Sequence, residues 1–397
     1  MNKRPKNSIS RKTSSSAALI LVAAALVYFG LNYFQKAQAP GPTLTVAPAV
    51  AITSAPATSG ATGAPAWLAV YFTNPNPPDA LGTGIDQYVQ PVIEAASRTI
   101  DVTSFDLNLP SLVNALAAAS KRGVSVRVVY DGTNGSLDLN NAATGNMPFD
   151  AIKTLKSAGV ALVDGGRSSG LMHDKMVIVD GATLFMGSWN LSYNDTYRNN
   201  NNLLKITDPK LIANYQAKFN ELFVDKHFGA KAKVKVPNPS LVIDGVTVEN
   251  YMAPEDEVMA KLVQYVGTAQ KTVHYMIFTY THDDLANAMI ARAKAGVQVE
   301  GVIENRGASQ GSLVPLFCAG MPVKTDGNKY TMHHKVIVID GQTVVTGSFN
   351  FTRSADTEND DNVLVIHSPA VAAIYEQEYQ KVSSIGLTPQ AADIKCK

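Results

Sequence analysis

The sequence contains one stretch twice, MHDKMVIVDGATLFMGSWN at residues 172–190 and MHHKVIVIDGQTVVTGSFN at residues 332–350. The two copies align without gaps, 160 positions apart. In each copy a histidine and a lysine stand two residues apart, so in a strand their side chains project from one face. The four residues after each lysine are apolar, which is typical of a strand buried on both sides. We therefore expect a buried strand that carries polar chemistry at its start.

Each copy continues in the same way after this strand. Asp180 and Asp340 each precede a glycine, which predicts a hairpin turn. Further along, both copies contain Gly-Ser-x-Asn, whose small residues would let the backbone and polar side chains approach an anion. The candidate phosphate-binding residues are Ser188, Asn190, Ser348 and Asn350.

The duplication extends beyond these motifs. Residues 99–131 and 272–304 align as strand–helix–strand stretches at an offset of 173, so the first copy holds 13 extra residues. We assign these to a surface loop in the Gly/Asn-rich stretch 132–146. Each copy then passes through a short strand into a closing helix, expected at residues 209–224 and 370–383.

A repeat of about 160 residues is too long for a solenoid unit. The alternation of strands and helices instead predicts an α/β fold of two fused half-domains, each a mixed β-sheet flanked by helices. We expect the halves, residues 67–235 and 236–397, to be related by a pseudo-twofold axis.

Two such halves would bring two imidazoles and two ammonium groups together. The lysines could hold the negative charge of a phosphodiester, one histidine could attack phosphorus, and the other could protonate the leaving oxygen and then activate water. This double displacement requires no metal and no cofactor. The candidate catalytic residues are His173, Lys175, Asp180, His333, Lys335 and Asp340, although the two aspartates are equally well explained as turn formers.

The doubled His-x-Lys-x4-Asp motif with its Gly-Ser-x-Asn resembles the phospholipase D superfamily, from residue 67 to about residue 385. The resemblance implies one active site at the interface of the two halves. It also implies that His173 is the nucleophile and His333 the acid/base.

The sequence departs from the family pattern at one point. Family members usually carry an acidic residue shortly after Gly-Ser-x-Asn that helps to orient a histidine. The second copy offers Asp361 as this supporting residue, but the first copy has the neutral Asn201. We interpret Asn194 and Asp195, just before it, as a polar loop.

The N-terminal region predicts an anchor. Residues 1–16 are basic, and the apolar run 17–34 is about long enough to cross a membrane, so we assign a signal anchor to residues 17–35 with the catalytic part outside the cytoplasm. A cleaved signal peptide, giving a secreted protein, is the alternative. Residues 36–66, rich in Ala, Pro, Thr and Ser, predict a disordered linker.

The charge composition favours one class of substrate over another but does not identify the substrate. Residues 1–39 hold six basic and no acidic side chains, which leaves 28 basic and 33 acidic residues beyond them, a net charge of −5. This balance favours a phospholipid over long nucleic acid. Phospholipid hydrolysis is therefore our first hypothesis, a nuclease of the same superfamily the second, and phosphatidyl transfer the third. The sequence implies no obligate protein partner. The two cysteines, Cys318 and Cys396, are either a pair or two separate thiols.

Overall fold

The computed structural model describes residues 63–391 and 394–396. The predicted anchor and most of the predicted linker lie outside these residues. Within the described part, no helix is both long and apolar enough to span a membrane.

The first sheet has seven strands in the order β1-β9-β8-β7-β2-β3-β6. Strands β2, β3 and β6 run parallel, and the neighbours from β2 through β7, β8 and β9 to β1 are antiparallel, so the sheet is mixed as predicted. Its strands are β1 (Leu68–Phe72), β2 (Thr99–Ser104), β3 (Ser125–Tyr130), β6 (Ala161–Asp164), β7 (Met176–Val179), β8 (Thr183–Gly187) and β9 (Asn202–Ile206).

The second sheet repeats this arrangement. Its order is β10-β11-β17-β16-β15-β12-β13-β14, which matches the first sheet strand for strand once β10 is set aside. Its strands are β10 (Ser240–Ile243), β11 (Val246–Ala253), β12 (Thr272–Ile277), β13 (Gln298–Ile303), β14 (Val323–Thr325), β15 (Lys335–Ile339), β16 (Thr343–Gly347) and β17 (Asp361–His367). The internal duplication of the sequence is therefore a duplication of topology.

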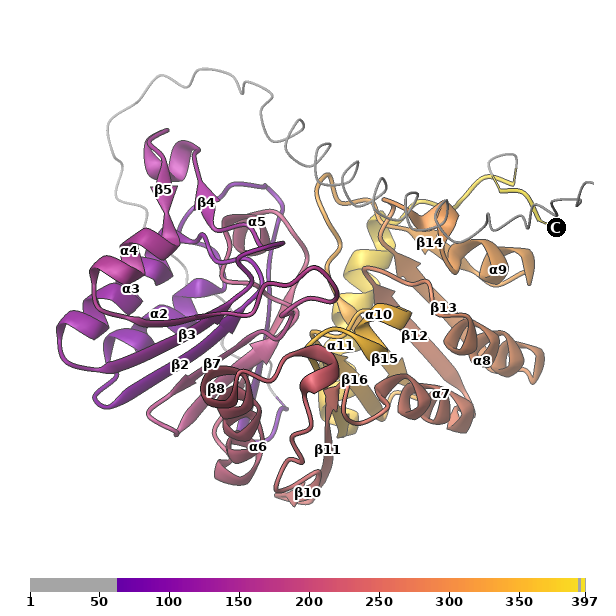
Figure 1. The fold of residues 1–397 in the computed structure, drawn as a ribbon. Coiled ribbons are helices and arrows are strands. Elements are labelled where there is room, and N and C mark those ends of the chain that lie inside the picture. The colour runs from indigo at the N-terminus through magenta and orange to yellow at the C-terminus, as the bar shows by residue number, and fades with distance from the viewer. Residues whose placement is uncertain (1–62, 392–393, 397) are drawn as a thin grey trace, which may run out of the picture. The chain divides into compact units, whose positions relative to one another are not determined.

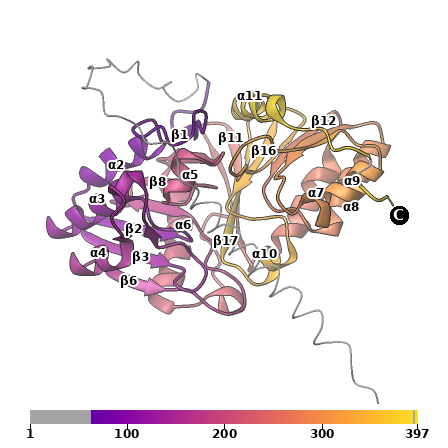
Figure 2. The same ribbon diagram turned by 90° about the horizontal axis from the view of Figure 1, so that it is seen from above.

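Helices cover the outer face of each sheet (Figures 1 and 2). Against the first sheet pack α2 (Asp86–Glu94), α3 (Pro110–Lys121) and α4 (Ala151–Ser157). Against the second pack α7 (Val258–Thr268), α8 (Asp283–Lys294) and α9 (Leu313–Cys318). The extra residues of the first copy form the small hairpin β4 (Asp138–Leu139) and β5 (Phe149–Asp150), with a 3-10 turn at Ala142–Thr144 between them.

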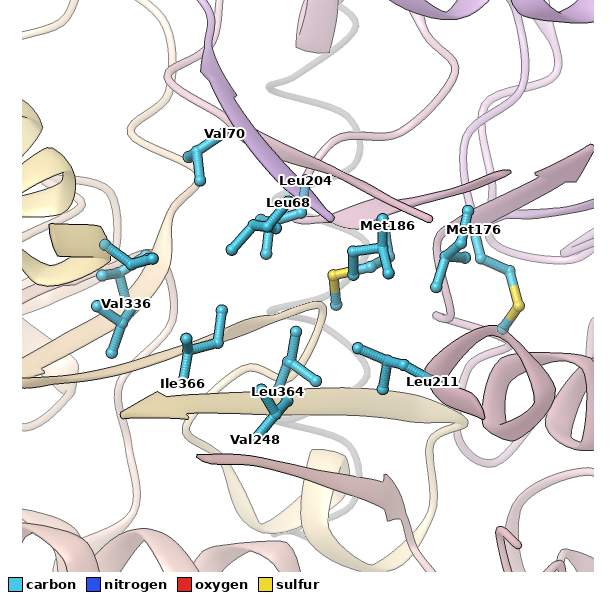
Figure 3. Close-up of a cluster of buried hydrophobic side chains, with 14 of the residues drawn as sticks. Leu68, Val70, Met176, Met186, Leu204, Leu211, Val248, Val336, Leu364 and Ile366 are labelled. Carbon is cyan, nitrogen blue, oxygen red and sulfur yellow. The ribbon is translucent and has the colours of Figure 1, made fainter. Parts of the chain in front are cut away.

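A third apolar core lies between the sheets (Figure 3). Leu68, Met186 and Leu204 of the first sheet face Leu364 and Ile366 of the second. The closing helices α6 (Pro209–Asn220) and α11 (Pro369–Ile385) complete this core. Because β7 and β15 are buried on both faces, each strand contributes to an outer core and to this shared one, which explains their unbroken apolar runs.

The first closing helix is shorter than predicted, because α6 ends at Asn220 and passes into a π-helical turn, Glu221–Asp225. Further 3-10 turns lie at Gly229–Lys231 and Ala308–Gln310. The structure also decides between the two interpretations of the cysteines. Cys318 and Cys396 form a disulfide, which ties the C-terminal segment to the end of α9.

Candidate active site

The segments before β7 and β15 bind to the opposite half. The main-chain N–H of His173 donates to the carbonyl of Asp360 (3.0 Å), and that of His333 donates to the carbonyl of Asn200 (2.9 Å). Both histidines therefore stand just before the strand rather than inside it, since their main chain pairs across the interface. This reciprocity is what a pseudo-twofold relation produces, and it joins both motifs in one site.

The two lysines occupy equivalent, fully buried positions. Nζ of Lys175 donates to the carbonyl of His173 and Nζ of Lys335 to that of His333, each at 2.7 Å. Phe105 packs edge-on against the first imidazole and lies beneath the first ammonium. In the second half, Phe278 packs in the same way against the imidazole of His333 and the ammonium of Lys335. Each histidine and its lysine are thus held on one face, as the spacing predicts.

Each imidazole is oriented by a residue of the other half. Nδ1 of His173 lies 2.8 Å from Oδ1 of Asp361, and Nδ1 of His333 lies 2.9 Å from Oδ1 of Asn201. Because both oxygens accept a hydrogen bond from Nδ1–H, Nε2 is the nitrogen left for chemistry. Among the described residues neither Nε2 has a hydrogen-bond partner.

A family model described as "Cardiolipin synthase, PLD-like domain" matches residues 89–223 and 262–383, once in each half. The chain belongs to the phospholipase D superfamily. Each of the two matched segments of this phospholipase D-like chain contains one copy of the His-x-Lys motif.

Each of two curated relatives matches about a third of the chain. The mitochondrial cardiolipin hydrolase of Chlamydomonas reinhardtii is 36% identical over 126 residues, which cover 31% of this chain and 56% of the relative. The phospholipase D of Rickettsia prowazekii is 32% identical over 120 residues, which cover 30% of this chain and 58% of the relative. The chain thus spans less than two thirds of the length of these relatives.

A solved structure resembles the chain more broadly. The phosphatidylserine synthase of Haemophilus influenzae superposes with a TM-score of 0.64 over 82% of this chain and 89% of that protein, at 13% identity. At this level of identity the likeness describes the fold of the phospholipase D-like chain and not its substrate.

The sequence analysis assigned the serines of Gly-Ser-x-Asn to phosphate binding, but in the structure their hydroxyls bind other side chains of the protein. Ser188 and Ser348 are fully buried, and their hydroxyls donate to Asn201 (2.8 Å) and Asp361 (2.6 Å). They therefore fix the residues that orient the histidines. The preceding glycine is required for a related reason: a Cβ on Gly187 would collide with the carbonyl oxygen of the adjacent strand β9.

The two asparagines of the motif differ. Nδ2 of Asn190 donates to Asp195 (2.7 Å), and its Oδ1 accepts from the main chain of Asp106 (3.3 Å). Oδ1 of Asn350 is buried and has no partner among the described residues. Of the four predicted phosphate-binding side chains, Asn350 is the one whose amide makes no hydrogen bond to another described residue.

Asp180 and Asp340 are not brought to the histidines. They follow the far ends of β7 and β15, in left-handed conformation before a glycine, which confirms the predicted hairpin turns. The carboxylate of Asp180 accepts main-chain N–H groups of residues 97–99, and Asp340 those of residues 270–272. We therefore correct their assignment: they fix the starts of β2 and β12 and do not contact the site.

Asp195 is the site residue that sequence reasoning missed. It is 2% exposed, and its Oδ2 lies 3.6 Å from Nδ1 of His333. The comparison of the copies concealed it, because the equivalent position of the second half is Ala355. Nothing in the duplicated pattern could have singled it out.

Burial and positive charge dominate the electrostatics. Burial and Lys175 lower the pKa of His173, although Asp361 opposes this shift. Burial and Lys335 lower the pKa of His333 well below its usual range. Burial lowers the pKa of Lys175 to about 8 and that of Lys335 well below its usual range. A bound phosphodiester anion would relieve this excess of positive charge.

Within residues 63–391 and 394–396, no cluster of three or more His, Cys, Asp or Glu side chains is suited to a metal ion. The polar groups of the site itself are two imidazoles, two ammonium groups and their carboxylate and amide partners.

Proposed function

We propose that this chain is a phosphodiesterase of the phospholipase D type that acts through a covalent phosphohistidine. The observation that carries the proposal is the pair of crossed imidazoles, each oriented through Nδ1 and each with a buried lysine at its side. The two lysines and Asn350 hold the non-bridging oxygens of the phosphodiester and stabilise the negative charge that develops on them.

His173 acts as the nucleophile. Its Nε2 attacks phosphorus and forms an N–P bond, while the bond from phosphorus to the leaving oxygen breaks. Asp361, whose carboxylate accepts a hydrogen bond from Nδ1–H, stabilises the positive charge that the phosphorylated imidazole carries. Nε2 of His333 donates a proton to the leaving oxygen.

Hydrolysis completes the cycle. Neutral His333 removes a proton from water, and the water oxygen attacks phosphorus as the N–P bond breaks. This step returns both histidines to their starting states, so no cofactor is consumed.

The substrate we propose is a phospholipid, from which hydrolysis releases the head group and leaves phosphatidic acid. The supporting observations are the names of the relatives, a cardiolipin hydrolase and a phospholipase D, and the net charge of −5 beyond residue 39. An acidic domain is poorly suited to long polyanions. Nuclease activity and phosphatidyl transfer are the alternative outcomes of the test.

Product analysis on defined substrates tests this proposal. With the full-length chain in EDTA, we expect phosphatidic acid and free head group from cardiolipin and phosphatidylcholine vesicles, and no cleavage of single- or double-stranded DNA. Loss of activity in EDTA that only a divalent cation restores would contradict the mechanism. DNA cleavage without lipid hydrolysis would establish the nuclease, and phosphatidyl transfer to an added alcohol without release to water would establish the transferase.

The pH profile of kcat/KM should be bell-shaped with both limbs at unusually low pH. His173 must be neutral to attack, and its pKa lies below the usual 6.5, so the acid limb should begin below pH 6.5. His333 and Lys175 must both be protonated. The pKa of His333 lies well below its usual 6.5, whereas that of Lys175 is about 8, so His333 loses its proton first and sets the alkaline limb. We expect about a tenfold loss per pH unit there, since kcat/KM reports the free enzyme. An alkaline limb near pH 10.5, the ordinary lysine value, would contradict this assignment.

We further propose that residues 17–35 anchor the protein, with residues 36–66 as the linker and the catalytic part outside the cytoplasm. The basic segment before the apolar run supports this orientation. The full-length chain should fractionate with membranes and be open to protease added from outside. A soluble form that begins near Pro40 would instead establish a cleaved signal peptide.

A further inference from the structure

The two halves of the site differ in where their carboxylate lies. Asp361 contacts His173 directly, whereas the residue 160 positions earlier is Asn201. The first half instead has Asp195, where the second half has Ala355. Relative to the other half, the acidic residue beside the histidine has therefore moved along the chain.

Asp195 is held rigidly. It lies in the short helix α5 (Tyr193–Tyr197), and both of its oxygens are bound. Oδ2 accepts from the main-chain N–H (2.9 Å) and the side-chain Nδ2 (2.7 Å) of Asn190, and Oδ1 accepts from Nδ2 of Asn199 (2.6 Å). In this position Oδ2 is 3.6 Å from Nδ1 of His333.

Asn201 orients the imidazole of His333 but carries no charge. Its Oδ1 faces Nδ1 of His333 at 2.9 Å, and its Nδ2 donates to the main-chain carbonyl of Asp195 at 3.1 Å. The second contact fixes which end of the amide faces the ring. A neutral amide can orient an imidazole, but it stabilises an imidazolium far less than a carboxylate does.

Burial and the positive charges nearest His333 disfavour its protonated form. Those that face it are Lys335, Lys175, His173 and His334. Asp195 also faces both lysines and the carboxyl of Asp106. Within the described part of the chain, the carboxylate that forms an ion pair with His333 is Asp195.

We propose that Asp195 is the positioning carboxylate of His333. Asp361 both orients and charge-stabilises its histidine, whereas the first half divides these tasks: Asn201 orients the ring and Asp195 stabilises the imidazolium. The consequence for catalysis rests on the proposed function, in which His333 is the acid that protonates the leaving oxygen and Asp195 supports it. The electrostatic pairing of Asp195 with His333 does not depend on the proposed function.

A histidine titration followed by NMR tests the pairing without any assay of activity. Asp195→Asn should lower the pH midpoint of His333 by about 1 unit, because a nearby negative charge is lost. Asp356→Asn is the matched control, because it removes a carboxylate from the equivalent helix of the second half, α10 (Arg353–Thr357). This carboxylate accepts the main-chain N–H of Met259, so its loss should leave the midpoint of His333 unchanged. An unchanged midpoint in Asp195→Asn would overturn the proposal.

The wild-type protein offers a second measurement that needs no variant. The carboxyl carbon of Asp195 should show a chemical-shift step at the pH where His333 titrates. Absence of this step would contradict the pairing even where Asp195→Asn fails to fold.

Kinetics then test the catalytic consequence. With a lipid substrate, whose alkoxide must be protonated, Asp195→Asn should lower kcat roughly 10- to 100-fold, a part of what general acid catalysis contributes. Its alkaline limb should move to lower pH, since His333 loses its proton earlier. With a nitrophenyl phosphodiester, whose leaving group needs no proton, the loss should largely disappear.

Relocation of the charge gives the sharpest comparison. Asn201→Asp added to Asp195→Asn copies the arrangement of Asp361 and should restore both the midpoint and the lipid activity. Asp361→Asn should instead lower activity on both substrates, because Asp361 contacts the nucleophile His173. An equal loss on both substrates in Asp195→Asn would mean a purely structural role. Wild-type inactivity on both substrates would refute the proposed function, while the titration would still decide the pairing.

Discussion

His173→Ala and His333→Ala should each lower kcat/KM at least about 1,000-fold, and the double variant should be scarcely less active than either single variant. Each imidazole is oriented by the opposite half, through Asp361 or Asn201, so neither half holds a complete site. Residues that act as one unit are strongly non-additive. The measurement is kcat/KM of the purified variants on phospholipid vesicles.

The control for this experiment is His274→Ala. His274 lies in β12, binds Glu376 (2.6 Å) and stacks on Tyr379 outside the site, so its loss should leave kcat nearly unchanged. Half of the wild-type activity in either single variant would indicate two independent sites and contradict the shared site. A nitrophenyl phosphodiester should partly rescue His333→Ala alone. Rescue of His173→Ala alone would reverse the assignment of nucleophile and acid.

Lys175→Met and Lys335→Met should each lower kcat/KM about 100- to 1,000-fold, the usual cost of removing a group that stabilises charge in the transition state. Folding lowers the pKa of both lysines, so their protonated forms oppose folding near neutral pH. Methionine fills a similar volume without that charge. We therefore expect the melting temperature to stay the same or rise while activity is lost.

An exposed lysine provides the matched control. Lys294→Met, at the end of α8, should change neither activity nor melting temperature appreciably. Activity and melting temperature that fall together in Lys175→Met would show that the ammonium serves the fold and not the reaction.

The prediction from sequence was strongest where the signal is local. The apolar residues 176–179 predict a strand buried on both sides, and this is what β7 is. Asp180 before Gly181 predicts a hairpin turn, and both residues have positive φ. Repetition alone does not indicate catalysis: Asp180 recurs in both copies as Asp340, but its carboxylate accepts the main-chain N–H at the start of β2.

The sequence by itself determined the duplication, the mixed α/β halves and the two histidine–lysine pairs, because periodicity and turn chemistry are properties of neighbouring residues. Only the tertiary structure decided how these parts serve one another. His173 and Asp361 are 188 positions apart, and Asp195 has no counterpart in the other copy. Their contacts arise because the two sheets bury a common core, and packing across that core selects partners that no spacing along the chain encodes.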